Sequence, residues 1–420
     1  MRRQHKAGIG FKLCLLIALV QAGARAAEAD NINWGPFLMT AGLTTGFEYD
    51  DNVNTSQNHP QTDYFLLMGP FLNGTVTLPI SLPGGQKAST QLGLAYTYKL
   101  SLTGRSVSTF TSPITASVLL PMYFQDWSVQ LSDNFSFQNS PLETAAGFNR
   151  TTIPEYNNVA LLSATRQFGS FSMTLAGQRT DIWAPDDIDL AETDYQVSIT
   201  PAWYLRENVS IFLRNSYGLV YPDDPVRQQV TYYSSEVGIA GVITPSLNGT
   251  VSIGFAHDHF DAVTLPGAGT GIFGGIFNPN VLPPSNLDGV ISTLALNYTH
   301  PFRPNTTYSL SFYRTPGVTA VLKNSNATQS TGMNLNIVHK LSADLTLQPQ
   351  VSWQHLEDVG AQIIGQPERA DIVLVGMQLS RAFGTKWVGA IQFNHQTRMS
   401  NLHGASYDDN KLDVTMTYTF

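Results

Sequence analysis

The 420-residue sequence contains a single cysteine, and charged residues make up only 13% of it. Because Cys14 lies near the N-terminus, the rest of the chain can form no disulfide bond and has no thiol chemistry. In soluble globular domains about a quarter of the residues are charged. Beyond the N-terminal region, no apolar run approaches the roughly 18 residues that a transmembrane helix needs. These absences disfavour both an ordinary soluble domain and a membrane protein built from helices.

The N-terminus has the pattern of a secretory signal peptide. A basic stretch without acids is followed by the apolar segment LCLLIALV and by the small-x-small sequence Ala24-Arg25-Ala26. We expect residues 1–26 to be removed on export, 27–38 to form a periplasmic segment and 39–420 to form a single domain. Without the five basic residues of the peptide, 31 Asp and Glu face 18 Lys and Arg. This balance argues against nucleic acid as a partner.

Polar and apolar residues alternate through most of the remaining chain. In the segment WSVQLSDNFSFQ, Trp127, Val129 and Leu131 share one face, and Ser128 and Gln130 share the other. An alternation with period two over about ten residues is typical of a strand that crosses a membrane. Such segments recur to the C-terminus and indicate about 18 strands. Sixteen is the alternative, because the segments 39–52, 231–244 and 287–301 alternate poorly.

The connections between these segments also alternate, between short turns such as RQFGSF and long loops such as 140–155 and 263–286. Outer-membrane barrels have short periplasmic turns and longer extracellular loops. Only a closed sheet pairs every strand edge inside a bilayer. We therefore predict an all-β protein, a closed antiparallel transmembrane β-barrel, in the outer membrane of a Gram-negative bacterium.

The polar faces of the segments carry neutral hydrogen-bonding groups instead of Lys and Glu. A face exposed to bulk water would normally be charged, so this composition fits the inside of a barrel. We expect a neutral polar lumen whose lining includes Gln130, Ser132, Asn134, Gln196, Ser198, Gln348, Gln350, Ser352, Gln392 and Asn394. Such a lining suits sugars better than a strongly charged ion filter would.

The tetrapeptide YDDN occurs at residues 49–52 and again at 407–410, where the first predicted strand ends and the last one begins. First and last strands pair in a closed barrel, so the two copies should lie side by side on the extracellular rim. Asp50, Asp51, Asp408 and Asp409 would then meet there. A Ca²⁺ ion bound by these carboxylates is our hypothesis for this place, and it is the only cofactor we expect. The acidic rim also suggests contact with lipopolysaccharide through divalent cations.

The longest connection, 263–286, has an apolar tip that contains Ile272, Phe273, Ile276 and Phe277. Long loops in compact folds are often functional. One hypothesis is that these four side chains fold into the pore as a constriction, and the alternative is a loop that lies on the surface.

The sequence ends in KLDVTMTYTF, an alternating segment with Tyr418 on its apolar face and a terminal Phe420. This ending resembles the C-terminal strand by which the barrel-assembly machinery recognises outer-membrane proteins. We therefore expect Tyr418 and Phe420 to act as the assembly signal. No HExxH or GxSxG motif and no other catalytic constellation is found, so no enzyme activity is expected.

The stretch GFEYDDNVNTSQNHPQTDYFLLMGPFLNGTVTLPI, followed by LGLAYTYKLSL, resembles outer-membrane β-barrel porins associated with exopolysaccharide gene clusters. The matching features are Tyr49 to Val53, Asp63, and Tyr96 with Tyr98, within residues 46–102. The resemblance implies a barrel linked to polysaccharide export or surface-polymer assembly. A porin-like channel that passes saccharides or an exopolysaccharide is the function we expect. The alternative is a structural or assembly barrel with a closed lumen, whose loops bind a partner or a polymer.

Overall fold

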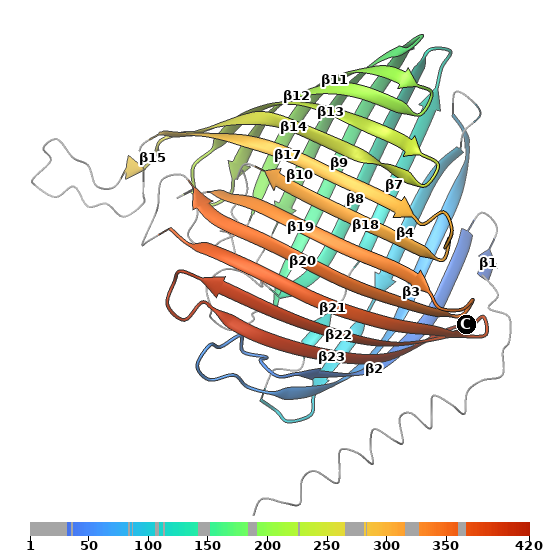
Figure 1. Ribbon diagram of the computed structural model, residues 1–420, viewed down its shortest axis with the longest axis vertical. Helices are drawn as coiled ribbons and strands as arrows, with labels where there is room; N and C mark the ends of the chain where they lie inside the picture. The colour runs from blue at the N-terminus through green and yellow to red at the C-terminus, as the bar shows by residue number, and fades with distance from the viewer. Residues whose placement is uncertain are drawn as a thin grey trace, which may run out of the picture.

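The computed structural model describes residues 32–34, 37–82, 85, 87–105, 109–111, 114–141, 152–183, 191–225, 227–264, 281–282, 284–315, 327–359 and 367–420. These residues form β-strands joined by turns and loops. One large antiparallel sheet closes on itself into a barrel (Figure 1), and a separate two-stranded sheet pairs β15 (Val263–Thr264) with β16 (Val281–Leu282). The predicted signal peptide, 1–26, lies outside the described residues. Among these residues, no helix is long and apolar enough to cross a membrane.

The barrel wall has 18 strand positions. The third position is shared by β4 (Lys87–Ala95) and β5 (Thr97–Ser101), and the fourth by β6 (Thr109–Thr111) and β7 (Ile114–Tyr123). The other positions are held by β2 (Phe37–Asp50), β3 (Asp63–Ser81), β8 (Trp127–Pro141), β9 (Thr152–Phe168), β10 (Phe171–Trp183), β11 (Glu192–Arg206), β12 (Val209–Pro222), β13 (Val230–Thr244), β14 (Leu247–Phe260), β17 (Ser285–Thr299), β18 (Thr306–Thr315), β19 (Ala327–Lys340), β20 (Leu345–Val359), β21 (Arg369–Phe383), β22 (Trp387–Ser400) and β23 (Tyr407–Thr419).

Pairing between the first and last wall strands closes the barrel. β2 runs antiparallel to β23, with a register from Gly42 opposite Thr419 to Asp50 opposite Lys411. This pair, which we call the closure seam, joins the two edge strands that an open sheet would leave unpaired, as a bilayer requires. The short strand β1 (Ile32–Trp34) pairs with the start of β2. The segment expected to be merely periplasmic, 27–38, thus contains β1 and the first two residues of β2.

The strand count is 18, although three of the predicted strands alternate poorly. They are present as β2, β13 and β17, and each pairs with a neighbour on both sides. The backbone supplies the reason: in lipid, every N–H and C=O group needs a partner inside the sheet. A strand whose own side chains alternate weakly is therefore held by its neighbours.

The outer face of the wall is apolar. Leu131, Leu162, Val197 and Tyr217 share one cross-strand row, and between 40% and 55% of each is exposed. Exposed apolar rows on a closed sheet are what contact with lipid tails requires. The alternate positions consequently face the lumen.

The two rims of the barrel differ. The short turns and the C-terminus lie at one end, and the short strand β15 lies beyond the other (Figure 1). At the short-turn end the Trp387 and Tyr418 rings lie 4.5 Å apart, and at the other end those of Tyr156 and Trp183 lie 4.8 Å apart. Aromatic residues at both levels match the two interfacial girdles of a transmembrane barrel. By the same rule the short-turn rim is periplasmic.

Candidate functional site: the lumen wall

All ten polar residues expected in the lumen lie on the inward face. Gln130, Ser132 and Asn134 alternate with the outward Leu131 on β8, and Gln196 and Ser198 alternate with the outward Val197 on β11. On β20 to β22, the paired register carries the remaining five onto the same inward rows: Gln348, Gln350, Ser352, Gln392 and Asn394.

Backbone pairing links two of these residues, Gln350 and Asn394, with inward residues of the neighbouring strands into one continuous row, which we call the lumen belt. The Ser309 hydroxyl donates to Asn297 Oδ1 over 2.8 Å, and Gln350 Nε2 donates to Asn394 Oδ1 over 3.4 Å. The second bond passes over Gly376, where an added Cβ would lie 2.5 Å from Asn394 Oδ1. From the short-turn end upward, the belt consists of Asn248, Asn297, Ser309, Asn336, Gln350, Gly376, Asn394 and Lys411.

The lumen is not neutral along its whole wall, contrary to the expectation from the sequence. At the closure seam, inward-facing Glu48 lies directly opposite Asp413. Lys99 Nζ lies 2.5 Å from Glu48 Oε1, and Lys411 Nζ lies 3.3 Å from Asp409 Oδ2. Like charges opposite each other on a sheet destabilise it, so these two lysines offset the repulsion. Neutral hydrogen-bonding groups line the belt from Asn248 to Asn394, whereas its last member, Lys411, belongs to the charged seam.

Two ion pairs are buried at the extracellular end. Arg227 Nη2 lies 2.8 Å from Glu192 Oε2, and both side chains are 3% exposed. Arg398 Nη2 lies 2.6 Å from Glu368 Oε1, with side-chain exposures of 1% and 4%. An unpaired charge at such depth would be costly. Each pair ties a loop residue, Arg227 or Glu368, to the inward side of a strand.

Part of the inner wall between β12 and β17 is closed to water. Val220, Val230, Tyr232 and Phe260 form a buried apolar cluster. The Tyr232 ring lies over Gly218, where an added Cβ would be 2.2 Å from its Cζ atom. Its hydroxyl lies 3.1 and 3.2 Å from the two carboxylate oxygens of Asp194. The described lumen wall therefore combines an open polar side with a packed side.

The two YDDN copies lie side by side across the closure seam. The Asp51 N–H donates to the Asn410 carbonyl oxygen over 3.2 Å, and Asn410 returns two bonds of 2.8 Å from its N–H and Nδ2 to the Asp51 carboxylate. Asn52 Nδ2 donates to the Asp408 carbonyl oxygen over 2.6 Å. Each tetrapeptide thus uses its asparagine to bind the other copy.

The four seam carboxylates do not converge on one point. Asp50 accepts from the Asn52 N–H, Asp408 accepts from the Thr397 hydroxyl, and Asp409 pairs with Lys411. Within the described part of the chain, no group of three or more His, Cys, Asp or Glu residues is placed to hold a metal ion. The geometry thus gives no support to the predicted Ca²⁺ site, because each of the four carboxylates has a different partner: a backbone N–H, the Asn410 donors, a hydroxyl or a lysine.

This geometry predicts that chelators leave the seam intact. Excess EDTA should shift the urea midpoint of unfolding of the detergent-solubilised barrel by no more than the experimental error, and added CaCl₂ should restore nothing. An Asn410→Ala variant, by contrast, should lose about 1–3 kcal/mol of stability, because the part-buried Asp51 carboxylate loses the Nδ2 donor and keeps only the backbone N–H of residue 410. A calcium-dependent midpoint that vanishes in an Asp51→Asn variant would contradict this.

The remaining predicted site residues fall into two groups. Ile272, Phe273, Ile276 and Phe277 lie outside the described residues, so the constriction stays a hypothesis. Tyr418 faces outward against Trp387, and the Phe420 N–H donates to the Ala41 carbonyl oxygen over 2.9 Å. Their role as an assembly signal also stays a prediction.

The sequence reasoning missed the charged inward residues. Glu48 alternates with Phe47 and Tyr49 on β2, so the same period-two rule places it in the lumen. Arg398 and Asp413 follow from the alternation of β22 and β23. These residues were missed because charged residues inside the predicted strands were not assigned to a face.

A comparison with protein-family models found no match, and no curated protein matched either. Solved structures with a similar shape include Pseudomonas aeruginosa OccK5 (OpdH), at 15% identity and a TM-score of 0.41, covering 91% of this chain and 98% of that one. P. aeruginosa OpdQ has 10% identity and a TM-score of 0.46, with coverages of 92% and 100%. Acinetobacter baumannii OccAB3 has 12% identity and a TM-score of 0.44, with coverages of 91% and 99%. The evidence for function therefore lies in the geometry of this barrel itself.

Proposed function

We propose that this protein is an outer-membrane channel that passes polar, uncharged solutes of the saccharide class. The lumen belt carries this proposal. Amide and hydroxyl groups from β14 through β22 line one continuous inward row, and some are already hydrogen-bonded to each other at distances of 2.8 to 3.4 Å. Such groups can exchange these bonds for bonds to sugar hydroxyls as a solute moves along the wall.

The lining of the belt changes from neutral groups near the short-turn rim to charged groups at the seam. Because wall strands tilt, the belt rises from Asn248 near the short-turn rim to Lys411 at the seam. Near the extracellular end of the belt a solute would meet charge, because Glu48 and Asp413 face the lumen beside Lys99. On the wall beyond the belt, inward-facing Arg214 and Glu236 form an ion pair over 2.9 Å. The resemblance of residues 46–102 to exopolysaccharide-associated porins supports a polysaccharide as the solute.

The second candidate function is a structural or assembly barrel, favoured by the packed inner wall around Val220, Val230, Tyr232 and Phe260. A lumen that is packed throughout would conduct nothing. Planar-bilayer recordings of the purified barrel separate the two functions: discrete conductance steps support the channel, and their absence at all voltages supports the structural barrel.

The belt gives the channel proposal a residue-level test. Gly376 pairs with both Gln350 and Asn394 and has no side chain. A Gly376→Trp substitution adds an indole between these two amides, so it should narrow the path along the belt. In liposomes containing the protein, we expect oligosaccharide uptake to fall at least about tenfold, since the path depends on pore diameter and on its hydrogen-bonding groups. Gly74→Trp, on the outer face of β3, is the matched control, and equal uptake by both variants would overturn the role of the belt.

A further inference from the structure

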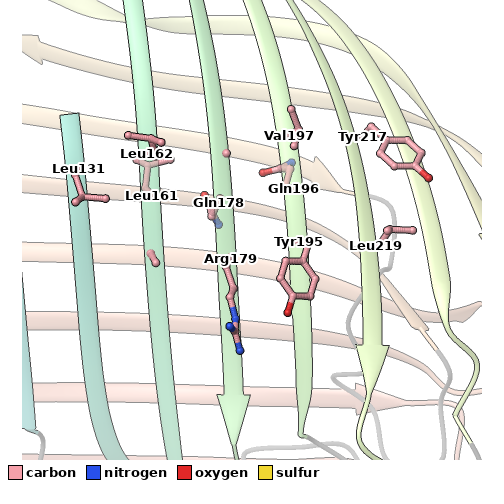
Figure 2. Close-up of a pocket in the computed structure, with 12 residues that line it drawn as sticks. Leu131, Leu161, Leu162, Gln178, Arg179, Tyr195, Gln196, Val197, Tyr217 and Leu219 are labelled. Atoms are coloured by element: carbon pink, nitrogen blue, oxygen red, sulfur yellow. The ribbon is translucent and has the colours of Figure 1, made fainter. Parts of the chain in front are cut away.

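One apolar depression lies on the outer face of the wall, across β8 to β12 (Figure 2). It exists because Gly177 and Ala160 are small where neighbouring outward residues are large. A Cβ built at Gly177 would meet no atom within 4 Å. Leu131, Leu162, Val197 and Tyr217 border this space, which we call the lipid groove.

A charged pair lies at the extracellular end of the lipid groove. Arg179 follows Gly177 by two residues on β10 and therefore faces outward as well, beside Tyr195 (Figure 2). Its Nε and Nη2 atoms donate to one oxygen of Asp181, Oδ1, over 3.1 and 2.8 Å. The Thr193 hydroxyl donates to the same oxygen over 2.9 Å.

This arrangement leaves one edge of the guanidinium available. Arg179 Nη1 has no hydrogen-bond partner among the described residues, and the side chain is 53% exposed. Its carbon atom Cζ lies 5.5 Å from the centre of the Tyr195 ring, which helps to hold the guanidinium in place. A fixed donor edge on the outer face can bind an anionic oxygen.

The position of Arg179 along β10 matches the boundary between lipid tails and headgroups. The strand passes from the groove at Gly177, through Arg179, to Trp183, which stacks on Tyr156 at the aromatic girdle. An arginine on the lipid-facing wall costs about 2–4 kcal/mol at the midplane and about 0–1 near the interface. Arg179 can therefore remain charged on the lipid-facing wall at this level.

We propose that the lipid groove and Arg179 together form a binding site for lipid A, the phosphorylated and acylated glycolipid of lipopolysaccharide. One acyl chain fills the space over Gly177 and Ala160, and a phosphate oxygen accepts from Arg179 Nη1. The site lies in the extracellular half of the wall, where the outer leaflet consists of this glycolipid. The inference thus depends on the outer-membrane location in the proposed function, but not on conduction.

The test uses the whole barrel in detergent and lipid A itself, with bound lipid counted by native mass spectrometry. Arg179→Gln should lower lipid A affinity about fivefold, as expected for one arginine near an anionic surface. Gly177→Leu, which fills the groove, should lower it by at least as much.

Arg381→Gln is the matched charge control, because Arg381 also faces outward and is 58% exposed, but lies at the periplasmic end. Gly74→Leu, whose Cβ would meet only Met39 Cγ at 3.6 Å, is the matched volume control.

Loss of affinity in both test variants and in neither control supports the site. Wild-type affinity in either test variant overturns it, and so does equal binding of phosphatidylglycerol, which shares only the negative charge. A wild-type dimer that Gly177→Leu dissociates would assign the groove to a second copy of the chain instead. Arg179→Gln removes only an exposed side chain, so it should fold even where Gly177→Leu does not. Conductance should be unchanged in both test variants, which separates failure of the lipid site from failure of the channel.

Discussion

Replacing Arg398 by methionine should destabilise the barrel by about 3–5 kcal/mol, the cost of leaving a buried carboxylate without its partner. Arg398 and Glu368 are almost completely buried, at 1% and 4% exposure, and their atoms approach to 2.6 Å. In the variant, Glu368 would keep only the Ser400 hydroxyl, which donates to the same oxygen over 2.6 Å. One neutral donor does not replace a guanidinium. The free energy of unfolding, measured by urea titration of tryptophan fluorescence in detergent micelles, checks this.

The loss of stability in Arg398→Met should come from the burial of the ion pair and not from the loss of an arginine as such. Arg381 pairs with Asp344 over 3.1 Å, but the two side chains are 58% and 42% exposed. Arg381→Met should therefore cost less than about 1 kcal/mol, as exposed pairs do. Removing both buried charges, in Arg398→Met with Glu368→Met, should recover much of the lost stability. Equal losses in Arg398→Met and Arg381→Met would show that Glu368 is not buried as described.

The architecture could be read from the sequence because one physical constraint acts on every wall strand. Lipid on one side and a polar lumen on the other impose period two, and Leu131 beside Gln130 and Ser132 shows it within three residues. The same rule assigned the ten predicted lumen residues to the inward face. Even β13 and β17, which alternate poorly, were among the 18 predicted strands.

The chemistry of the site was harder to predict, because it depends on which donor reaches which acceptor. The sequence brings four aspartates to the closure seam, and metal binding was a reasonable hypothesis for them. The structure shows that Asn52 and Asn410, in the same tetrapeptides, reach across the seam and use the opposite copy as partner. Side-chain directions of this kind follow from register, and no composition or spacing reveals them.

The lipid groove illustrates a second limit of sequence reasoning. Gly177 and Ala160 are unremarkable in the sequence, since glycine and alanine are common in strands of any barrel. Their meaning comes from pairing: register puts Leu162 and Val197 on either side of Gly177. The depression at a small residue can therefore be recognised only when the side chains of the paired strands are known.

Closure of the barrel should be the folding step most sensitive to added side-chain volume. Gly42 lies in β2 at the closure seam, and a Cβ there would lie 2.2 Å from the Tyr418 carbonyl oxygen and 2.4 Å from the Phe71 ring. Phe71 can rotate, but the carbonyl oxygen belongs to the backbone of β23 and has no alternative position within the paired sheet. Gly42→Val should therefore separate the two strands and weaken the 2.9 Å bond from the Phe420 N–H to the Ala41 carbonyl oxygen.

Overpacking of this kind costs about 1–3 kcal/mol in a core that can adjust, and at the seam it also opposes the pairing that completes the barrel. We expect the yield of folded Gly42→Val, scored by heat-dependent gel mobility after refolding into detergent, to fall at least about tenfold. Gly74→Val is the control, because the nearest atom to its Cβ is Met39 Cγ at 3.6 Å, and it should fold like the wild type. Equal yields for the two variants would mean that β2 and β23 do not pair in this register. Gly42→Ala adds a smaller side chain at the same place, so its yield should lie between those of the wild type and Gly42→Val.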